Sequence, residues 1–245
     1  MFKTPDPVTD SHDKRIAVTT AIRRQIVDGV LKPGERLPSF EKLAERFAVG
    51  SGTVRRAVAS LEEEGVLVCR HGSGTYVASF RAGRYWNRFQ RYQRRDGSII
   101  EKTESRLLHF EQMPAPEVVA LKLGIAPGTT VIHAYREITF DRNGVGLDEI
   151  FLPRSRFCNL SAAHLRERGS ERSLYTLYED TDGILITSSS DVVYAECLTP
   201  HNAGLLGLQA GIPMLVLERI SYDAAGAPVE YRFEKVRAED CRIRL

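Results

Sequence analysis

The sequence predicts an α+β fold with two parts, a helical N-terminal part that ends in a β-hairpin and a larger C-terminal part built on an antiparallel sheet. Two observations predict it. Residues 14–78 hold three amphipathic segments followed by two short β-prone runs around glycines. Residues 99–245 alternate strand-like and helical runs, with hairpin turn signals between neighbouring strands. Such a mixture is typical of an antiparallel sheet with helices packed on it.

The first helix is expected over residues 14–30, where an apolar face recurs at helical spacing until Gly29 and Pro33 interrupt it. Ser39, after a Leu-Pro pair, is a natural N-cap for a second helix, because a serine hydroxyl accepts a hydrogen bond from a free helical N–H. Residues 49–52 make the turn that follows.

A third helix is expected over residues 51–64, because Val54, Val58 and Leu61 recur at spacings of four and three. This spacing buries those three side chains and turns others partly outward, namely Thr53, Arg55 and Arg56. Residues 66–70 and 75–78 then form a hairpin around His71-Gly72-Ser73-Gly74. Three helices followed by a hairpin predict a winged helix-turn-helix, a module that places its third helix in the DNA major groove.

The C-terminal part shows six strand-like runs, at residues 105–110, 130–140, 145–152, 184–196, 214–222 and 229–236. Helical candidates lie between them at residues 117–123, 160–166, 173–179 and 202–208. Turn signals at residues 141–144 and 223–226 join neighbouring strands, which implies an antiparallel sheet. We expect helices to cover one face of it.

Between the two parts lies a connector, residues 80–98, with six arginines against the single Asp96. Aromatic side chains interleave with them, and Trp86, Phe89 and Gln93 fit one side of a short helix. Net charge is +2 over residues 1–79, +5 over the connector and −5 over residues 99–245. The N-terminal third therefore favours phosphate and the C-terminal part does not.

Other classes of protein receive no support from the sequence. Residues 1–245 hold no apolar run of about 18 residues and no secretory leader, so we expect a cytoplasmic protein without a membrane segment. The four cysteines stand far apart, which predicts neither a zinc site nor disulfides. No catalytic motif occurs, and four histidines have no recognisable partner, namely His109, His133, His164 and His201. We expect no enzyme activity, cofactor or metal.

The chain resembles the GntR family of bacterial transcription regulators, in its HutC-like branch. The runs PGERLPS, TVR and HGSGTYV carry the N-terminal resemblance over about residues 14–79. The rest is similar to the effector-binding domain named UTRA, whose fold is similar to chorismate lyase. That match rests on five short stretches, at residues 126–128, 136, 148–153, 173–175 and 226–231.

The resemblance implies a flexible arm (1–13), a DNA-binding domain (14–79), a linker (80–98) and an effector-binding and dimerisation domain (99–245). The first residues of the third helix are those that reach base edges, and Arg55 is the best candidate for a bidentate contact to guanine. The DNA-contacting residues expected are Ser39, Ser51, Thr53, Arg55, Arg56, His71 and Gly72.

The sequence departs from the family pattern at two DNA-contacting places. Phe40 and Glu41 stand where an acidic and then a basic residue are usual, and Ser51 stands where arginine is usual. We therefore predict an operator half-site different from the usual one of the family, with extra phosphate affinity from the arginines of the connector.

In relatives that bind sugar phosphates, two strand arginines meet the anionic group and two carboxylates take hydroxyls. Arg136 fits the first arginine, whereas Ile138 occupies the second position. Asp148 and Glu230 match the carboxylates, and Ser173 lies near a helix start that favours anions. A single arginine suggests a carboxylate or a polar neutral metabolite. The alternative is that Arg136, Asp148 and Glu230 form a plain cross-strand ion pair.

Three functional hypotheses follow. The first is a homodimeric transcription regulator, in particular a repressor, which binds double-stranded operator DNA at an approximate palindrome and whose affinity a small-molecule effector controls. The second is an enzyme with a chorismate-lyase-like fold. The third is a constitutive DNA-binding dimer without effector. The motifs favour the first.

Overall fold

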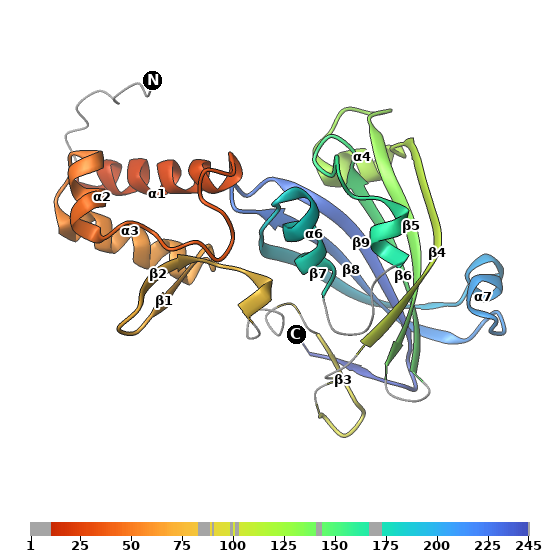
Figure 1. The fold of residues 1–245 in the computed structure, drawn as a ribbon. Helices are drawn as coiled ribbons and strands as arrows, with labels where there is room; N and C mark the ends of the chain where they lie inside the picture. The colour runs from red at the N-terminus through yellow and green to blue at the C-terminus, as the bar shows by residue number, and fades with distance from the viewer. Residues whose placement is uncertain are drawn as a thin grey trace.

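The computed structural model describes residues 11–82, 89, 91–98, 100, 103–140, 144–166 and 173–244 (Figure 1). Most of the predicted arm and the tip of the connector, including Trp86, lie outside these residues. The described part shows a helical head and a sheet domain, joined by the connector.

The head consists of α1 (Ser11–Val27), α2 (Phe40–Phe47), α3 (Ser51–Glu63), β1 (Leu67–Arg70) and β2 (Gly74–Val77). Ser39 caps α2, since its Oγ accepts a hydrogen bond from the Lys42 N–H at 3.3 Å. Ala48 then ends α2 in the left-handed conformation, with φ 52°. The three helices pack through fully buried side chains, among them Ile22, Val54 and Leu61. The predicted winged helix-turn-helix is confirmed.

The hairpin of the head is held close to the loop before α2. Leu37 N–H donates to the Thr75 carbonyl at 2.8 Å, and Arg36 bridges to Tyr76. Gly74 has φ +119°, and a Cβ on it would stand 2.7 Å from the Arg36 Nε. The backbone conformation therefore requires glycine at this position, and a side chain there would also displace the Arg36 guanidinium.

The sheet domain has six antiparallel strands in the order β4-β5-β6-β9-β8-β7. Their bounds are β4 (Thr103–Pro114), β5 (Thr130–Phe140), β6 (Gly144–Pro153), β7 (Ile186–Cys197), β8 (Pro213–Asp223) and β9 (Pro228–Arg237). The helices are α4 (Glu117–Leu123), α5 (Ala162–Arg166), α6 (Leu174–Asp182) and α7 (Pro200–Leu206). Each predicted strand and helix of this domain is present.

Helices pack on both faces of the sheet, so the expectation of one covered face is wrong. On the inner face, α5 and α6 bury their apolar side chains against residues such as Ile132 and Ile150. On the outer face, α4 packs against Val131 and Phe151, and α7 packs near Met214. Successive strand residues point to opposite faces, so a strand with apolar residues on both sides needs cover on both sides.

The short helix expected in the connector falls largely outside the described residues, Trp86 included, whereas the described Gln93 lies in a strand. Phe80–Ala82 form a single 3-10 turn, and Tyr92–Gln93 form β3, which pairs with β10 (Arg242–Ile243). The Arg244 N–H also donates to the Arg91 carbonyl at 2.7 Å. Because the pairing partner lies about 150 residues further along the chain, local periodicity could not reveal this strand.

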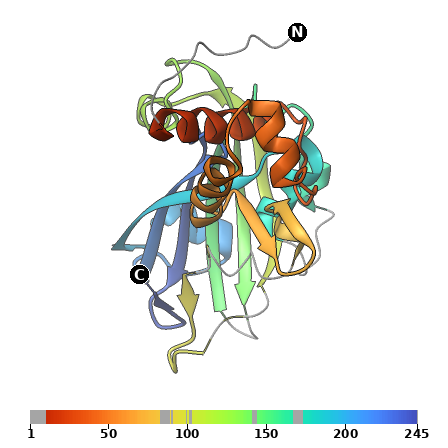
Figure 2. The ribbon, with the colours of Figure 1, turned by 90° about the vertical axis from the view of Figure 1, so that its left-hand side faces the viewer.

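The head meets the sheet domain at a polar junction, seen from the side of the head in Figure 2. Glu179 of α6 accepts hydrogen bonds from Ser79 Oγ at 2.8 Å and from the Phe80 N–H at 2.7 Å. A second contact joins Arg23 Nη1 of α1 to the Ala224 carbonyl at 2.7 Å. Burial raises the pKa of Glu179 to about 7, although both of its hydrogen bonds act in the opposite direction.

The free energy of unfolding is predicted to fall as the pH rises from about 4.3 to about 7. Between these values the folded chain keeps a proton on Glu179 that the unfolded chain has lost. Glu179→Gln should remove this part of the pH dependence, worth at most about 4 kcal/mol. Urea unfolding at several pH values measures it. Glu63→Gln, at an exposed site of α3, is the control, and an unchanged slope in Glu179→Gln would contradict the assignment.

Candidate functional site

The exposed surface of the head carries the predicted DNA contacts on α3. Arg55 and Arg56 are exposed, as is Ser51 at the first residue of the helix. Their neighbours Val54, Ala57 and Val58 are buried in the head core. This division fixes the orientation of α3, so that its two arginines face away from the core and are free to meet phosphate or bases.

Thr53 differs from the expectation that it turns partly outward, because only 9% of its surface is exposed. Its position, one residue before Val54, places it at the edge of the buried face of α3 rather than on the exposed one. Ser39 is exposed, and its hydroxyl oxygen already accepts the hydrogen bond from Lys42 that caps α2. Ser39 therefore serves as the N-cap of α2.

The hairpin between β1 and β2 presents His71 and Gly72 at its tip, both exposed. Gly72 has φ +71°, which favours glycine in this turn. Tyr76 supports the tip from behind: its hydroxyl lies 2.7 Å from the Ser73 hydroxyl, and the Arg70 guanidinium lies 4.5 Å from the centre of its ring. The wing is thus a hairpin whose tip Tyr76 holds in place and which carries the positive charge of Arg70.

Glu41, one of the residues that depart from the family pattern, changes the electrostatics near the start of α3. Hydrogen bonds from its own N–H and from Ser39 hold the pKa of Glu41 below its usual value, and the nearby Arg55 adds to this effect. A carboxylate therefore stands close to the best candidate for base contact. Among the connector arginines, Arg81 pairs with Asp180 and Arg91 with Asp191, so these two hold the sheet domain rather than extend toward the head.

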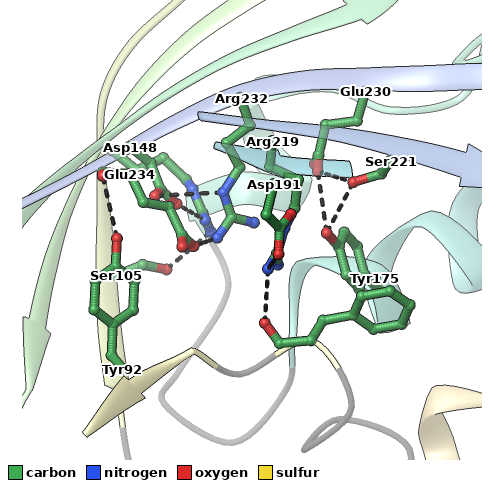
Figure 3. A network of polar contacts seen from close by, with 12 residues as sticks. Tyr92, Ser105, Asp148, Tyr175, Asp191, Arg219, Ser221, Glu230, Arg232 and Glu234 are labelled. Carbon is green, nitrogen blue, oxygen red and sulfur yellow. Dashed lines mark hydrogen bonds and ion pairs between the residues drawn. The ribbon is translucent and has the colours of Figure 1, made fainter. Parts of the chain in front are cut away.

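A group of buried polar side chains lies on the inner face of the sheet, where α6 and the connector cover it (Figure 3). We call this group the inner-face network; it comprises the half-buried Asp191 and the buried Arg136, Asp148, Tyr175, Tyr178, Arg219, Ser221, Glu230, Arg232 and Glu234. The strand register brings its charged members together in rows, because directly paired residues share one face. Arg136 pairs with Asp148, which pairs with Glu234. In the next row Asp191 pairs with Arg219, which pairs with Arg232.

The first row contains Arg136, predicted for the anionic group of a ligand, and Asp148, predicted for its hydroxyls. Arg136 Nη2 donates to Asp148 Oδ2, and Arg136 Nη1 reaches Ser105 Oγ at 3.4 Å. Arg232 forms ion pairs with Glu234 and, at 3.5 Å, with Asp148 Oδ1. Within the described residues, no hydrogen bond reaches three buried atoms of the two rows: Arg136 Nε, and Arg232 Nε and Asp148 Oδ1, which face each other at 3.5 Å. Unpaired buried polar atoms are costly and need an explanation.

Glu230 is held by hydroxyl groups rather than by an arginine. Its Oε1 accepts from Ser221 Oγ at 2.7 Å and from Tyr175 OH at 3.2 Å, and its Oε2 accepts from Tyr178 OH at 2.6 Å. Burial raises the pKa of Tyr178 well above its usual value, and the Glu230 charge adds to it, so this hydroxyl keeps its proton. The structure thus realises the Arg136–Asp148 ion pair of the alternative hypothesis and gives Glu230 other partners.

Ser173 stands at the start of α6 and caps it, since its Oγ accepts from the Thr176 N–H at 3.2 Å. It therefore positions the helix that carries Tyr175 and Tyr178 to Glu230. Of the four predicted effector-site residues, the structure brings three into one network and places Ser173 at the end of the helix that covers it.

Two residues of the connector, Phe89 and Tyr92, add hydrogen bonds to the network. Arg219 binds Asp191 through Nε and Nη2, at 2.7 and 2.8 Å, and its Nη2 also donates to the Phe89 carbonyl at 2.9 Å. Tyr92 OH donates to the Glu234 carbonyl at 3.1 Å. Burial opposes ionisation of Asp191, yet the hydrogen bonds and charge of Arg219 hold its pKa below the usual value. This pair therefore remains ionised in the interior.

Arg219, Arg232 and Glu234 were not predicted for the site, although the sequence holds a signal for them. Glu230, Arg232 and Glu234 alternate along β9, and Arg219 and Ser221 do the same along β8. Period-two charges in a strand covered on both faces indicate a buried polar surface. Arg232 and Glu234 have the same parity as Glu230 on β9, whereas Arg219 shares its parity with Ser221 on β8.

The outer face holds two of the four histidines that lacked a partner in the sequence, His109 and His133. His133 contacts Glu111 and Glu149, at 3.3 and 3.1 Å, and Tyr135 OH donates to Glu149 at 2.7 Å. His109 lies 3.2 Å from Glu111. Across the part of the chain that the structure describes, no group of three or more His, Cys, Asp and Glu residues is arranged to hold a metal ion.

No helix of the described residues is long and apolar enough to cross a membrane. The four cysteines are free thiols, with Cys241 buried and the other three exposed.

Known proteins share both parts of this arrangement. Residues 101–242 match the UTRA domain, and residues 15–77 match the bacterial regulatory proteins of the gntR family. The repressor MngR of the mannosyl-D-glycerate transport and metabolism system of Escherichia coli is 28% identical over 230 residues, 93% of each chain. The repressor PhnF of Mycolicibacterium smegmatis is 30% identical, over 88% of this chain and 85% of PhnF.

Among solved structures, one ligand-binding domain from Bordetella bronchiseptica, described as part of a GntR-family regulator, is similar with a TM-score of 0.59 and 27% identity. The similarity covers 64% of this chain and 96% of that domain.

Removing the Asp148 carboxylate is predicted to destabilise the chain strongly. Asp148→Asn would leave Arg136 and Arg232 without this counter-charge in the interior, and breaking a buried pair costs about 3–5 kcal/mol. Arg106→Gln is the control, because Arg106 pairs with Glu137 while its side chain is 69% exposed. Such a pair contributes less than about 1 kcal/mol. Equal losses of unfolding free energy in urea would contradict the role of Asp148.

Proposed function

The chain belongs to the GntR family of bacterial regulatory proteins and carries a UTRA domain, and from this premise we propose that it is a homodimeric, effector-controlled repressor. It is a DNA-binding transcription regulator, as its family is. The observation that carries the proposal is the presence, in one chain, of an exposed, arginine-bearing α3 and of a buried polar network in which three polar atoms lack a hydrogen bond.

The proposed division of the chain follows the contacts. Residues 1–13 form the arm, 14–79 the DNA-binding domain, 80–98 the linker, and 99–245 the effector-binding and dimerisation domain. Ser79 and Phe80, which bind Glu179, mark the end of the head. Cytoplasmic residence and the absence of enzyme activity are part of the proposal, since the named relatives are transcription repressors.

The proposed DNA contacts are those of α3 and the wing, supported by the helix caps. Arg55 reads a base edge, Arg56 binds phosphate, and His71 and Gly72 approach the neighbouring backbone. Ser39 and Ser51 lie at the helix starts that face the same surface. Thr53, at the edge of the buried face of α3, takes part in DNA binding with only the small part of its side chain that is exposed.

The proposed effector contacts are Arg136, Asp148, Ser173 and Glu230, with Arg232 added by the structure. Arg136 Nε, Arg232 Nε and Asp148 Oδ1 lack hydrogen bonds. Ligand groups that both donate and accept hydrogen bonds, such as hydroxyls, would satisfy them. Each arginine of the network already has a carboxylate partner. A doubly charged phosphate would therefore add uncompensated negative charge to the interior. This supports a polar hydroxylated compound with at most one carboxylate as the effector.

Binding-site selection from genomic fragments is expected to return an approximate palindrome, with half-sites about one turn of DNA apart. Because Glu41 and Ser51 replace expected cations, the half-site should differ from the usual operator of the family. Recovery of that usual operator would contradict the second expectation, and recovery of sequences without a shared motif would contradict specific binding.

Arg55→Ala is expected to weaken binding to the selected operator by roughly 5- to 150-fold and to relax the preference at one base pair, as loss of a bidentate base contact does. Arg56→Ala should weaken binding to all sequences alike and reduce its salt dependence. Fluorescence anisotropy with operator and scrambled DNA measures both. Arg24→Ala, on exposed α1, serves as the control, and equal effects of Arg24→Ala and Arg55→Ala would rule out the base contact.

Thermal unfolding with added compounds tests the effector class, because a bound ligand raises the midpoint by mass action. The probes are neutral sugars and polyols, monocarboxylates, and sugar phosphates. We expect a rise with a member of the first two groups, and its loss in Arg136→Ala but not in Arg106→Gln. A rise with sugar phosphates alone would contradict the proposed class.

A further inference from the structure

The helix α6 contacts both the inner-face network and the end of the head. Figure 1 shows it on the side of the sheet that faces the head. It spans Leu174–Asp182, with Ser173 capping its start and Gly183 its end. Its end groups are satisfied by these caps, and its contacts on the network side and on the head side belong to one short helical segment.

On the network side, α6 presents two tyrosines to Glu230. The hydroxyl groups of Tyr175 and Tyr178 lie 3.2 and 2.6 Å from its carboxylate oxygens. Both rings are buried, at 4% and 0% exposure. A group that donates hydrogen bonds to Glu230, or accepts them from the two tyrosines, therefore competes with contacts that α6 makes.

On the head side, the next residues of the same helix hold the chain where the head ends. Glu179, directly after Tyr178, accepts from Ser79 Oγ and the Phe80 N–H, and Asp180 accepts from Arg81 Nε at 2.8 Å. Ser79 lies two residues beyond the end of β2, so little chain separates Glu179 from the wing.

Aromatic rings close the space between the two sides. The ring of Tyr175 lies 5.1 Å from that of Phe80 and 5.4 Å from that of Phe89, centre to centre. The Phe89 carbonyl in turn accepts from Arg219 of the network. Packed interiors transmit small displacements because they hold few voids.

We propose that α6 is the element that couples effector binding to the DNA-binding head, with Tyr178 as the positioning residue on the network side and Glu179 on the head side. This inference rests on the proposed function, because it concerns the regulation of that same site. A change at Glu230 moves Tyr178, and the adjoining Glu179 then alters its hold on Ser79 and Phe80. The coupling acts in both directions, as linkage requires.

The test compares two tyrosine variants of the full chain. Tyr178→Phe removes one hydroxyl donor to Glu230. Tyr231→Phe is the matched control, because Tyr231 OH donates to the Glu218 carboxylate at 2.9 Å on the outer face of the sheet. Hydrogen exchange, which reports local opening, is followed at the Phe80 amide. Urea unfolding of each variant corrects for any loss of global stability.

We expect Tyr178→Phe to change exchange at the Phe80 amide by at least about threefold, beyond its global effect, and Tyr231→Phe to leave it unchanged; contacting residues commonly couple by this much. Operator affinity should shift by a similar factor in Tyr178→Phe, and the shift should vanish in the Glu179→Gln background. Unchanged exchange at Phe80, or additive effects of Tyr178→Phe and Glu179→Gln on affinity, would overturn the proposal.

The two arms separate failure of this inference from failure of the proposed function. If the wild-type chain shows no preference for any selected DNA, the proposed function fails, and the exchange arm still decides whether α6 links the network to the head. If the wild type binds its operator and the two variants act additively, the coupling role of α6 fails alone.

Discussion

The structure depends most on one constraint, the need of buried charges for partners. Arg136, Asp148, Arg219, Arg232 and Glu234 lie on one face of the sheet with at most 8% of their surface exposed. Each unpaired charge in such a place would cost several kcal/mol. The strand register sets Arg136 beside Asp148 and Arg219 beside Asp191. Arg232 forms ion pairs with Glu234 and Asp148, and the connector supplies further partners. Any register slip would separate these pairs, so the network specifies the alignment of the sheet as well as a polar site.

The same constraint links the site to the rest of the chain. Glu230 takes its hydrogen bonds from α6, and α6 binds the chain at the end of the head through Glu179. The two regions of the protein are therefore not joined by the connector alone. A regulator must convert ligand binding in one place into a change in another, and a rigid helix with polar contacts on both sides provides such a connection. Because the pKa of the buried Glu179 is about 7, the charge at this junction changes with pH near neutrality.

Much of the fold followed from the sequence, and the failures have identifiable causes. The helices of the head and the six long strands were predicted because their apolar residues repeat at 3.6 and 2 residues. Arg136, Asp148 and Glu230 were found through a family resemblance, whereas Arg219 and Arg232 were missed because their partners lie on other strands. β3 escaped prediction since its pairing partner is β10. Helical spacing alone predicted that Thr53 points outward. It lies at the border between the buried and exposed faces of α3, where the packing of neighbouring side chains decides its exposure.

By itself, the sequence determined the order of the elements, the amphipathic faces of the head helices and the presence of a DNA-binding module, because these depend on local spacing and on residues close together in the chain. Only the tertiary structure decided which charges meet on the inner face, which helices cover each side of the sheet and where the head is held. Those contacts join residues up to about 200 positions apart, such as Arg23 with Ala224. Their existence depends on strand register and packing, which no local pattern records.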